Sequence, residues 1–191
     1  MKSTGKRHQK KSVKRAIGRS LKDQSQASNE LINLALQHHS AGRLAEAGQL
    51  YQQILVAEPS QPVALQYLGV LAHQLGKNDT AIDLIAQALV IKPDYAEAHG
   101  NLGVALNAKG RFKEAVASYR KATLANPVYV EAHYNLGIVL HKLGQFDEAI
   151  ASYTLALDLK PDYEEALGNL GNVLKDVGRL EEATAYYRQV I

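Results

Sequence analysis

The 191-residue sequence contains no cysteine, so it can form neither a disulfide nor a thiolate metal site. It also has no run of about 18 apolar residues, the length that a membrane-spanning helix needs. Its first residues are charged and no apolar segment follows them, so a secretory signal is not indicated. Together these absences predict a cytoplasmic protein.

Catalytic sequence motifs are lacking as well. The sequence has no phosphate-binding glycine loop, no Gly-x-Ser-x-Gly elbow and no His-Glu-x-x-His pair. We therefore expect that this chain is not an enzyme in its own right and that it has no catalytic residues and no cofactor.

Charge is unevenly distributed along the chain. Residues 1–27 hold nine Lys and Arg and one acid, a net charge of +8, whereas residues 28–191 hold 13 basic and 18 acidic residues, a net charge of −5. The body is therefore a poor candidate for binding nucleic acid. Nucleic acid or an anionic membrane remains an alternative partner only for residues 1–27.

Three interpretations of residues 1–27 stay open. Val13, Ile17 and Leu21 are four residues apart and would form one apolar stripe on a short helix, which suits an anionic membrane surface or nucleic acid. The segment is basic and nearly free of acids, which is also typical of a transit-like segment. A disordered, solvated tail is the interpretation that we favour.

What the sequence does contain is a repeat of 34 residues. Four of its five prolines, Pro59, Pro93, Pro127 and Pro161, follow one another at that interval. A period of this size indicates one structural unit copied along the chain. With each proline at position 32, the units are 28–61, 62–95, 96–129, 130–163 and 164–191, of which the last is incomplete. Leu at position 7, Gly at position 15 and Ala at position 20 then recur in all five units.

Each unit reads as two helices. In the third unit, Ala98, Leu102, Ala105 and Leu106 form one apolar stripe at helical spacing, and a second stripe begins at Phe112. The glycine at position 15 between them is expected to be a left-handed C-terminal cap, and the proline ends the second helix. The Asp94/Glu97 and Asp162/Glu165 pairs have the spacing of a side-chain cap at the start of the next first helix.

A second glycine recurs where a helix would not favour it. Gly69, Gly103, Gly137 and Gly171 occupy position 8, in the middle of the first helix, where glycine is about 1 kcal/mol less favourable than alanine. Its recurrence predicts a close approach by the neighbouring helix. We expect the backbone at the small residue of position 20 to be the partner. Because helices of this length are marginal alone, we also expect stability to come from stacking of the units.

These positions resemble the tetratricopeptide repeat. The pattern has Leu-Gly at positions 7–8, Ala at 20, an aromatic residue at 24, Ala at 27 and Pro at 32. The fourth unit matches throughout, with Leu136-Gly137, Ala149, Tyr153, Ala156 and Pro161. The first two units depart at Ala35, Ile54 and Ile85. The resemblance covers residues 28–191 and implies an all-α, right-handed superhelical solenoid of antiparallel helix pairs. Its first helices would line a concave groove that binds a peptide or a partner protein.

A finer resemblance concerns position 6, where four units carry Asn. Segments such as Ala132-His133-Tyr134-Asn135-Leu136-Gly137 look like the repeat arrays of O-linked N-acetylglucosamine transferases. In that family an asparagine ladder holds the backbone of an extended substrate, and a carboxamide suits this because it both donates and accepts hydrogen bonds. The resemblance implies a peptide-binding set of Asn33, Asn101, Asn135, Asn169, Tyr134, His141 and Asn172.

Two function classes follow from these resemblances. The first is a non-enzymatic scaffold that binds an extended peptide or partner protein in its groove. The alternative is the substrate-recognition part of a protein glycosyltransferase whose catalytic domain lies beyond Ile191. The chain stops inside a second helix, without the polar cap that solenoids need, so we expect a fragment of a longer protein and self-association through this C-terminal end.

Histidine also recurs in register, but it does not predict a metal site. His99 and His133 share position 4, and His39, His73 and His141 share position 12. Packed helices lie about 8–10 Å apart, whereas a Zn–N bond is about 2.0–2.1 Å long, so equivalent residues do not share an ion easily. We expect the histidines at position 4 to pack between helices and those at position 12 to be solvated or to line the groove.

Overall fold

The structure is a computed structural model that describes residues 26–189. Every regular element in that range is a helix, which confirms the predicted all-α class. The chain divides into two compact units, residues 1–64 and 65–191. The helices are residues 26–40, α2 (Leu44–Ala57), α3 (Pro62–Gln74), α4 (Asn78–Ile91), α5 (Ala96–Ala108), α6 (Phe112–Ala125), α7 (Val130–Lys142), α8 (Phe146–Leu159), α9 (Glu164–Asp176) and α10 (Leu180–Tyr187).

The predicted basic tail lies almost entirely outside the described residues. Its last two residues, 26 and 27, are already helical, so the first helix reaches at least two residues further toward the N-terminus than the repeat register predicted. The interpretations of residues 1–25 therefore stay predictions.

The first compact unit contains one complete helix pair, formed by residues 26–40 and α2. Ile32 and Ala35 of the first helix are buried together with Ala47, Tyr51 and Ile54 of α2. These five residues recur at helical spacing on their two helices, so one apolar stripe from each helix supplies the core.

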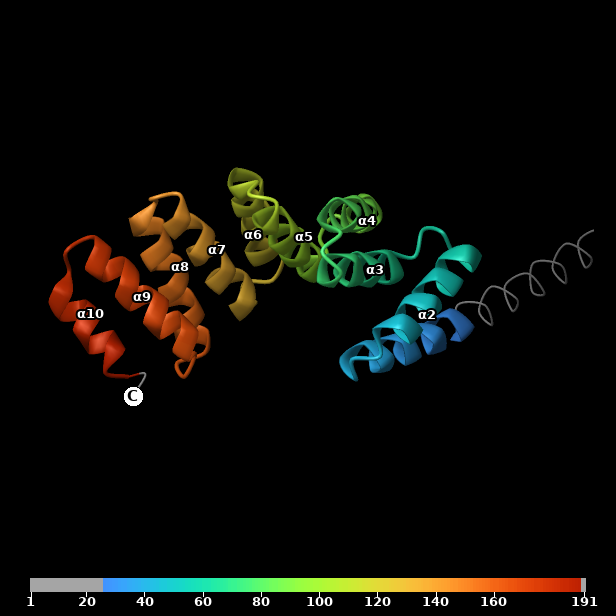
Figure 1. Ribbon diagram of the computed structural model, residues 1–191, viewed down its shortest axis with the longest axis horizontal. Helices are drawn as coiled ribbons and strands as arrows, with labels where there is room; N and C mark the ends of the chain where they lie inside the picture. Colours follow the sequence, from blue (N-terminus) through green and yellow to red (C-terminus); the bar gives the residue numbers. More distant parts are fainter. Residues whose placement is uncertain (1–25, 190–191) are drawn as a thin grey trace, which may run out of the picture. The chain divides into compact units, whose positions relative to one another are not determined.

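The second compact unit stacks its helices in chain order, as Figure 1 shows for α5 to α10. Each helix from α4 to α10 contacts the next, and α5 also contacts α7, which contacts α9. The first helices of successive repeats therefore lie side by side within residues 65–189. The core runs through all of these pairs and includes Leu106, Tyr119, Leu140, Tyr153 and Leu174.

The turn inside each helix pair is set by the glycine at position 15. All five of these glycines have φ between 72° and 81°, which confirms the predicted left-handed cap. After α7, for example, the Gln145 backbone N–H donates to the Leu140 carbonyl oxygen at 2.9 Å, and the Gly144 N–H donates to His141 at 2.9 Å. These bonds satisfy the last carbonyl groups of the helix and turn the chain back onto itself.

The glycine at position 8 marks a close approach, but its partner differs from the prediction. A Cβ atom added at Gly137 would lie 2.7 Å from Cε1 of Tyr153, and one at Gly103 would lie 2.6 Å from Cε1 of Tyr119. The neighbour is thus the aromatic side chain at position 24, not the backbone at position 20. At Gly69 the position-24 residue is Ile85, at 2.6 Å, and the carbonyl oxygen of Ala81 at position 20 is second, at 3.1 Å.

The expected side-chain caps of the first helices are absent from α5 and α9. Their N-cap residues are Tyr95 and Tyr163, and neither helix has a side-chain cap hydrogen bond. The prediction failed because the turn after the proline places the tyrosine, rather than the preceding aspartate, at the cap. In α3 the side chain of Gln61 does cap the helix, since its Oε1 accepts the backbone N–H of Val63 at 2.7 Å.

None of the helices in residues 26–189 combines the length and the apolar character that crossing a bilayer requires.

Candidate functional site

Three of the four predicted asparagines form a row on neighbouring first helices. Asn101 lies on α5, Asn135 on α7 and Asn169 on α9, and each is half-buried. Because α5, α7 and α9 contact one another in that order, the three side chains occupy equivalent places on one surface, which we call the first-helix face. Asn33 is exposed on the helix over residues 26–40, which belongs to the other compact unit.

The three carboxamides of this row are not equivalent in their contacts. The Asn169 Nδ2 group donates to the hydroxyl oxygen of Tyr134 at 3.1 Å. Asn101 and Asn135, in contrast, find no side-chain hydrogen-bond partner among residues 26–189. Two half-buried carboxamides are therefore available to a ligand, and the third is engaged inside the protein.

Tyr134 lies on α7, the middle one of the three helices that carry the asparagine row. Its ring centroid lies 4.8 Å from that of Tyr163 and 6.0 Å from that of Tyr153. Burial and the nearby Glu165 carboxylate raise the pKa of Tyr134, while the hydrogen bond from Asn169 lowers it. The hydroxyl therefore stays protonated at neutral pH and keeps a proton to donate.

The C-terminal ends of the same helices are joined by polar contacts. His141 Nε2 lies 2.8 Å from Oδ2 of Asp176 on α9, and Lys142 Nζ donates to Oδ1 of Asn107 on α5 at 3.3 Å. The predicted site residue His141 thus contacts the next first helix. These contacts position α5, α7 and α9 relative to one another.

Asn172, the remaining predicted site residue, is engaged elsewhere. Its Oδ1 accepts a hydrogen bond from the Tyr187 hydroxyl of α10 at 2.8 Å. This contact ties α9 to its own second helix, so the Asn172 carboxamide is less available than those of Asn101 and Asn135.

The sequence reasoning missed a row of tyrosines beside the asparagines. Tyr95, Tyr129 and Tyr163 occupy position 34 and are the N-cap residues of α5, α7 and α9. Each turns back onto position 5 of its own repeat unit. The Tyr95 hydroxyl donates to Oε1 of Gln66 at 2.8 Å, and the ring of Tyr163 packs on Tyr134. The interval of 34 residues between these tyrosines was the signal that could have found them.

In the sequence, each of these tyrosines is followed two residues later by a glutamate at position 2 of the next unit. Glu97, Glu131 and Glu165 lie in the first turns of α5, α7 and α9. Burial raises the pKa of Tyr129, and Glu131 and Glu97 raise it further. Burial, Tyr134, Glu165 and Glu131 together raise the pKa of Tyr163 to about 12. We call Glu97, Tyr129, Glu131, Tyr163 and Glu165 the tyrosine–glutamate edge.

The acids of this edge differ from those of the second helices. Glu97, Glu131 and Glu165 form no ion pair with any basic side chain of residues 26–189. On the second helices, Arg111 pairs with Glu114, Arg120 with Glu148, and Arg179 with Glu182. The three glutamates of the edge therefore have no ion pair to compensate them in the described part of the chain, and Asp83 and Asp158 of the second helices share this property.

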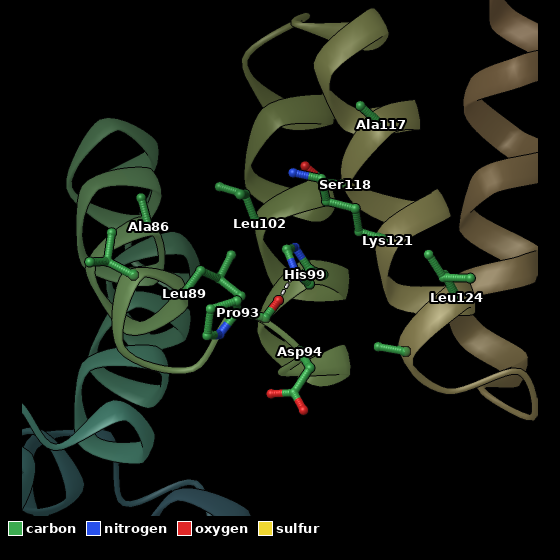
Figure 2. A pocket seen from close by; sticks show the side chains of 12 residues that line it. Ala86, Leu89, Pro93, Asp94, His99, Leu102, Ala117, Ser118, Lys121 and Leu124 are labelled. Carbon is green, nitrogen blue, oxygen red and sulfur yellow. Dashed lines mark hydrogen bonds between the residues drawn. The ribbon is translucent and has the colours of Figure 1, made fainter.

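A cavity of about 650 Å³ lies elsewhere in the same unit, between α4, α5 and α6 (Figure 2). Its walls are mainly apolar and include Leu89, Leu102 and Leu124, with Asp94 and Lys121 also lining it. His99 reaches into it from α5, and its Nε2 lies 2.8 Å from the Pro93 carbonyl oxygen. Asp94 is the carboxylate among these lining residues, and it forms no ion pair with a basic side chain of residues 26–189.

The histidines at position 4 pack between repeats, as expected. His99 and His133 are buried, and their Nε2 atoms lie 2.8 and 2.9 Å from the carbonyl oxygens of Pro93 and Pro127. Each therefore ties a first helix to the proline turn that precedes it. Within residues 26–189 no group of three or more His, Asp or Glu side chains could hold a metal ion.

Comparison with protein families gives matches over most of the chain. One model described as a tetratricopeptide repeat matches residues 33–96, 67–126 and 108–164, and a second with the same description matches residues 140–191. No curated protein sequence matches this chain. The family matches therefore rest on the repeat units themselves.

Solved structures with a similar fold include MamA and PilF. A crystal structure of MamA is 27% identical, with a TM-score of 0.74 over 82% of this chain and 91% of that one. A double mutant of MamA from RS-1 is 21% identical, with a TM-score of 0.76 over 85% of this chain and 92% of that one. Pseudomonas aeruginosa PilF is 20% identical, with a TM-score of 0.81 over 88% and 77%. The last two share the fold alone.

These matches do not support the finer resemblance to O-linked N-acetylglucosamine transferases, because none of them is a glycosyltransferase. The asparagine row must therefore be interpreted from its own geometry.

Proposed function

The chain belongs to the tetratricopeptide repeat family, and from this premise we propose that it is a protein-interaction scaffold which binds an extended peptide along its first-helix face. The observation that carries the proposal is the pair of half-buried carboxamides without partners, Asn101 and Asn135. A carboxamide both donates and accepts, so it can pair with any peptide unit whatever side chain that unit carries. Such groups suit recognition of a backbone.

The spacing of the row fits an extended chain. Helices in contact lie about 8–10 Å apart, and an extended peptide advances about 3.3 Å per residue. Asn101 and Asn135, on neighbouring first helices, would then address peptide units about three residues apart. Tyr134, on the same face, adds an aromatic surface with a hydroxyl group that already binds Asn169.

Binding can be measured with peptides selected from a randomised 12-residue phage library panned against the full chain. We expect Asn101→Ala combined with Asn135→Ala to weaken binding of a selected peptide roughly tenfold, because each lost hydrogen bond contributes about 0.5–1.5 kcal/mol. Fluorescence anisotropy of the labelled peptide gives the dissociation constant. Gln53→Ala combined with Gln87→Ala removes two exposed carboxamides from second helices and should leave binding unchanged.

The same experiment separates binding from folding. The thermal melting curve of the asparagine double variant should match that of the unmodified chain, because neither carboxamide has a partner inside residues 26–189. Loss of stability would mean that these side chains are structural, and selection of no peptide, or equal binding by the double variant, would overturn the proposal.

Tyr134→Phe should tighten binding, because it releases the carboxamide of Asn169.

A further inference from the structure

The turns that lead into the first helices show how this protein holds a cation against a tyrosine. In the turn from Lys92 to Tyr95 the lysine Nζ lies 4.4 Å from the centroid of the tyrosine ring. The turn from Lys160 to Tyr163 repeats this arrangement at 4.7 Å. Both distances are within the range of a cation–π interaction. Two of the position-34 tyrosines are therefore covered by a lysine of the chain itself.

The geometry of the turn explains the contact. The Tyr95 backbone N–H donates to the Lys92 carbonyl oxygen at 3.3 Å, and Tyr163 donates to Lys160 at 3.2 Å. Positions 31 and 34 are thus the two ends of one tight turn with proline at its second place. A lysine at position 31 is held over the tyrosine at position 34.

The turn between α6 and α7 has the same backbone but lacks the cation. Its Tyr129 N–H donates to the Asn126 carbonyl oxygen at 3.2 Å, so Asn126 takes the place of the lysine. The Asn126 side chain bonds locally, since its Oδ1 accepts the Val128 N–H at 3.2 Å. No Lys or Arg of the described part of the chain lies over the Tyr129 ring.

The surroundings of Tyr129 favour a positive charge. Its ring covers Gly100 of α5, where an added Cβ atom would lie 3.0 Å from Cε1 and 3.1 Å from the hydroxyl oxygen. The ring therefore depends on the glycine for its place on the first-helix face. The fields of Glu97 and Glu131 both act on Tyr129, and neither glutamate has an ion-pair partner in residues 26–189.

We propose that Glu97, Tyr129 and Glu131 form a binding site for one Lys or Arg side chain of a basic, extended peptide segment. The side chain would take the place over Tyr129 that Lys92 and Lys160 take over Tyr95 and Tyr163. The carboxylates of Glu97 and Glu131 supply the opposite charge. This inference rests on the proposed function, because it names the chemistry of the segment that the first-helix face receives.

The test compares two labelled peptides, (Arg-Ser-Gly)5 and (Gln-Ser-Gly)5, on the full chain at a fixed salt concentration of about 150 mM, where exposed charges more than about 8 Å apart are largely screened. We expect the arginine peptide to bind more tightly. Glu97→Gln combined with Glu131→Gln should weaken its binding about tenfold or more. Asp83→Asn combined with Asp158→Asn makes the same change in net charge on second helices, and it should change binding less than twofold.

A second pair of variants tests the site without removing an acid. Asn126→Lys supplies the cation from the chain itself, so it should weaken binding of the arginine peptide by about 2- to 30-fold, the range that a cation–π contact covers. Asn126→Ala loses the same local hydrogen bond without adding a cation, and it should bind as the unmodified chain does. Equal binding by Asn126→Lys and Asn126→Ala would overturn the proposal.

Failure of this inference is distinguishable from failure of the proposed function. If the phage-selected peptides bind through Asn101 and Asn135 but the arginine peptide binds Asn126→Lys and Asn126→Ala equally well, the cation site is wrong and the peptide-binding face stands. If the arginine peptide depends on Glu97 and Glu131 but not on the two asparagines, the cation site stands and recognition of an extended backbone is wrong. Uniform weakening by both the first-helix and second-helix charge variants would indicate diffuse attraction, and the site would be refuted.

Discussion

The first and second helices of the unit formed by residues 65–191 are built from the same repeat but treat charge differently. Acids of the second helices, such as Glu148, are neutralised by arginines, whereas Glu97, Glu131 and Glu165 of the first helices have tyrosines as neighbours and no ion pair in the described range. The second helices also supply the rings that the glycines of the first helices accommodate. The difference teaches that equivalent repeat units can compensate one set of glutamates with arginines and leave another set, at position 2, beside tyrosines.

The largest effect should come from filling the space that a first helix leaves for its second helix. A Cβ atom at Gly137 would lie 2.7 Å from the ring of Tyr153, which is 1% exposed and cannot move aside. Gly137→Ala should therefore destabilise the protein by about 1–3 kcal/mol, and Gly137→Leu should unfold the middle of the array. Thermal unfolding followed by circular dichroism measures both.

The matched control for this substitution is another glycine of a first helix. A Cβ atom at Gly168 would meet nothing within 4 Å, and the residue is helical, so Gly168→Ala should stabilise the protein by up to about 1 kcal/mol. Substitutions of opposite effect at positions 8 and 5 would sharpen the comparison. An unchanged melting curve for Gly137→Leu would contradict the close approach of the Tyr153 ring to Gly137.

The next effect should appear at alkaline pH, through the rings of the second helices. Burial raises the pKa of Tyr119 and of Tyr153 well above the usual value of 10.0. Above pH 10 the unfolded chain loses these protons more readily than the folded chain does, so it binds fewer protons and stability falls as pH rises. The stabilisation is complete below pH 10 and is lost progressively as pH rises toward the folded pKa values.

This dependence can be removed by substitution. Tyr119→Phe combined with Tyr153→Phe should move the midpoint of alkaline unfolding, followed by circular dichroism between pH 9 and 12.5, to higher pH. Tyr186→Phe, at a half-buried position of α10, should leave the midpoint in place. A double variant that unfolds at the same pH as the unmodified chain would contradict the assignment to these two rings.

The smallest effect should distinguish the two sets of acids. Glu148→Gln removes the ion pair with Arg120 that joins α8 to α6, and we expect a loss of at most about 1 kcal/mol, as for other exposed pairs. Glu131→Gln removes an acid without an ion pair and should leave stability unchanged or slightly higher. Urea denaturation resolves this difference. A larger loss for Glu131→Gln than for Glu148→Gln would contradict the view that an ion pair stabilises Glu148 but not Glu131.

The sequence was sufficient to predict the helix pairs, because a period of 34 residues fixes which residues are equivalent. The left-handed glycines at position 15 followed from the same register, since a helix that must reverse within three residues requires that conformation. Recurrence, however, does not say which of two nearby groups fills a gap. Gly137 was therefore assigned to the backbone at position 20, although the ring of Tyr153 fills the space.

The candidate site was predicted only in part for a related reason. The register identified Asn101, Asn135 and Asn169 as equivalent, but only Asn169 has a tyrosine at position 5 of the preceding first helix to bind. Glu97 was interpreted as a capping residue because its spacing from Asp94 is suitable, yet the proline turn makes Tyr95 the N-cap. Such outcomes depend on side-chain contacts between units, which a pattern within one unit does not contain.

The turn before each first helix has a consequence for how such arrays diversify. A single exchange between lysine and asparagine at position 31 alters what the following tyrosine can receive, and the residue lies outside the packed interior. If the cation site is correct, a single codon change at position 31 would alter specificity without changing a core residue. An array built from units such as 62–95, 96–129 and 130–163 could then carry a different residue 31 in each unit.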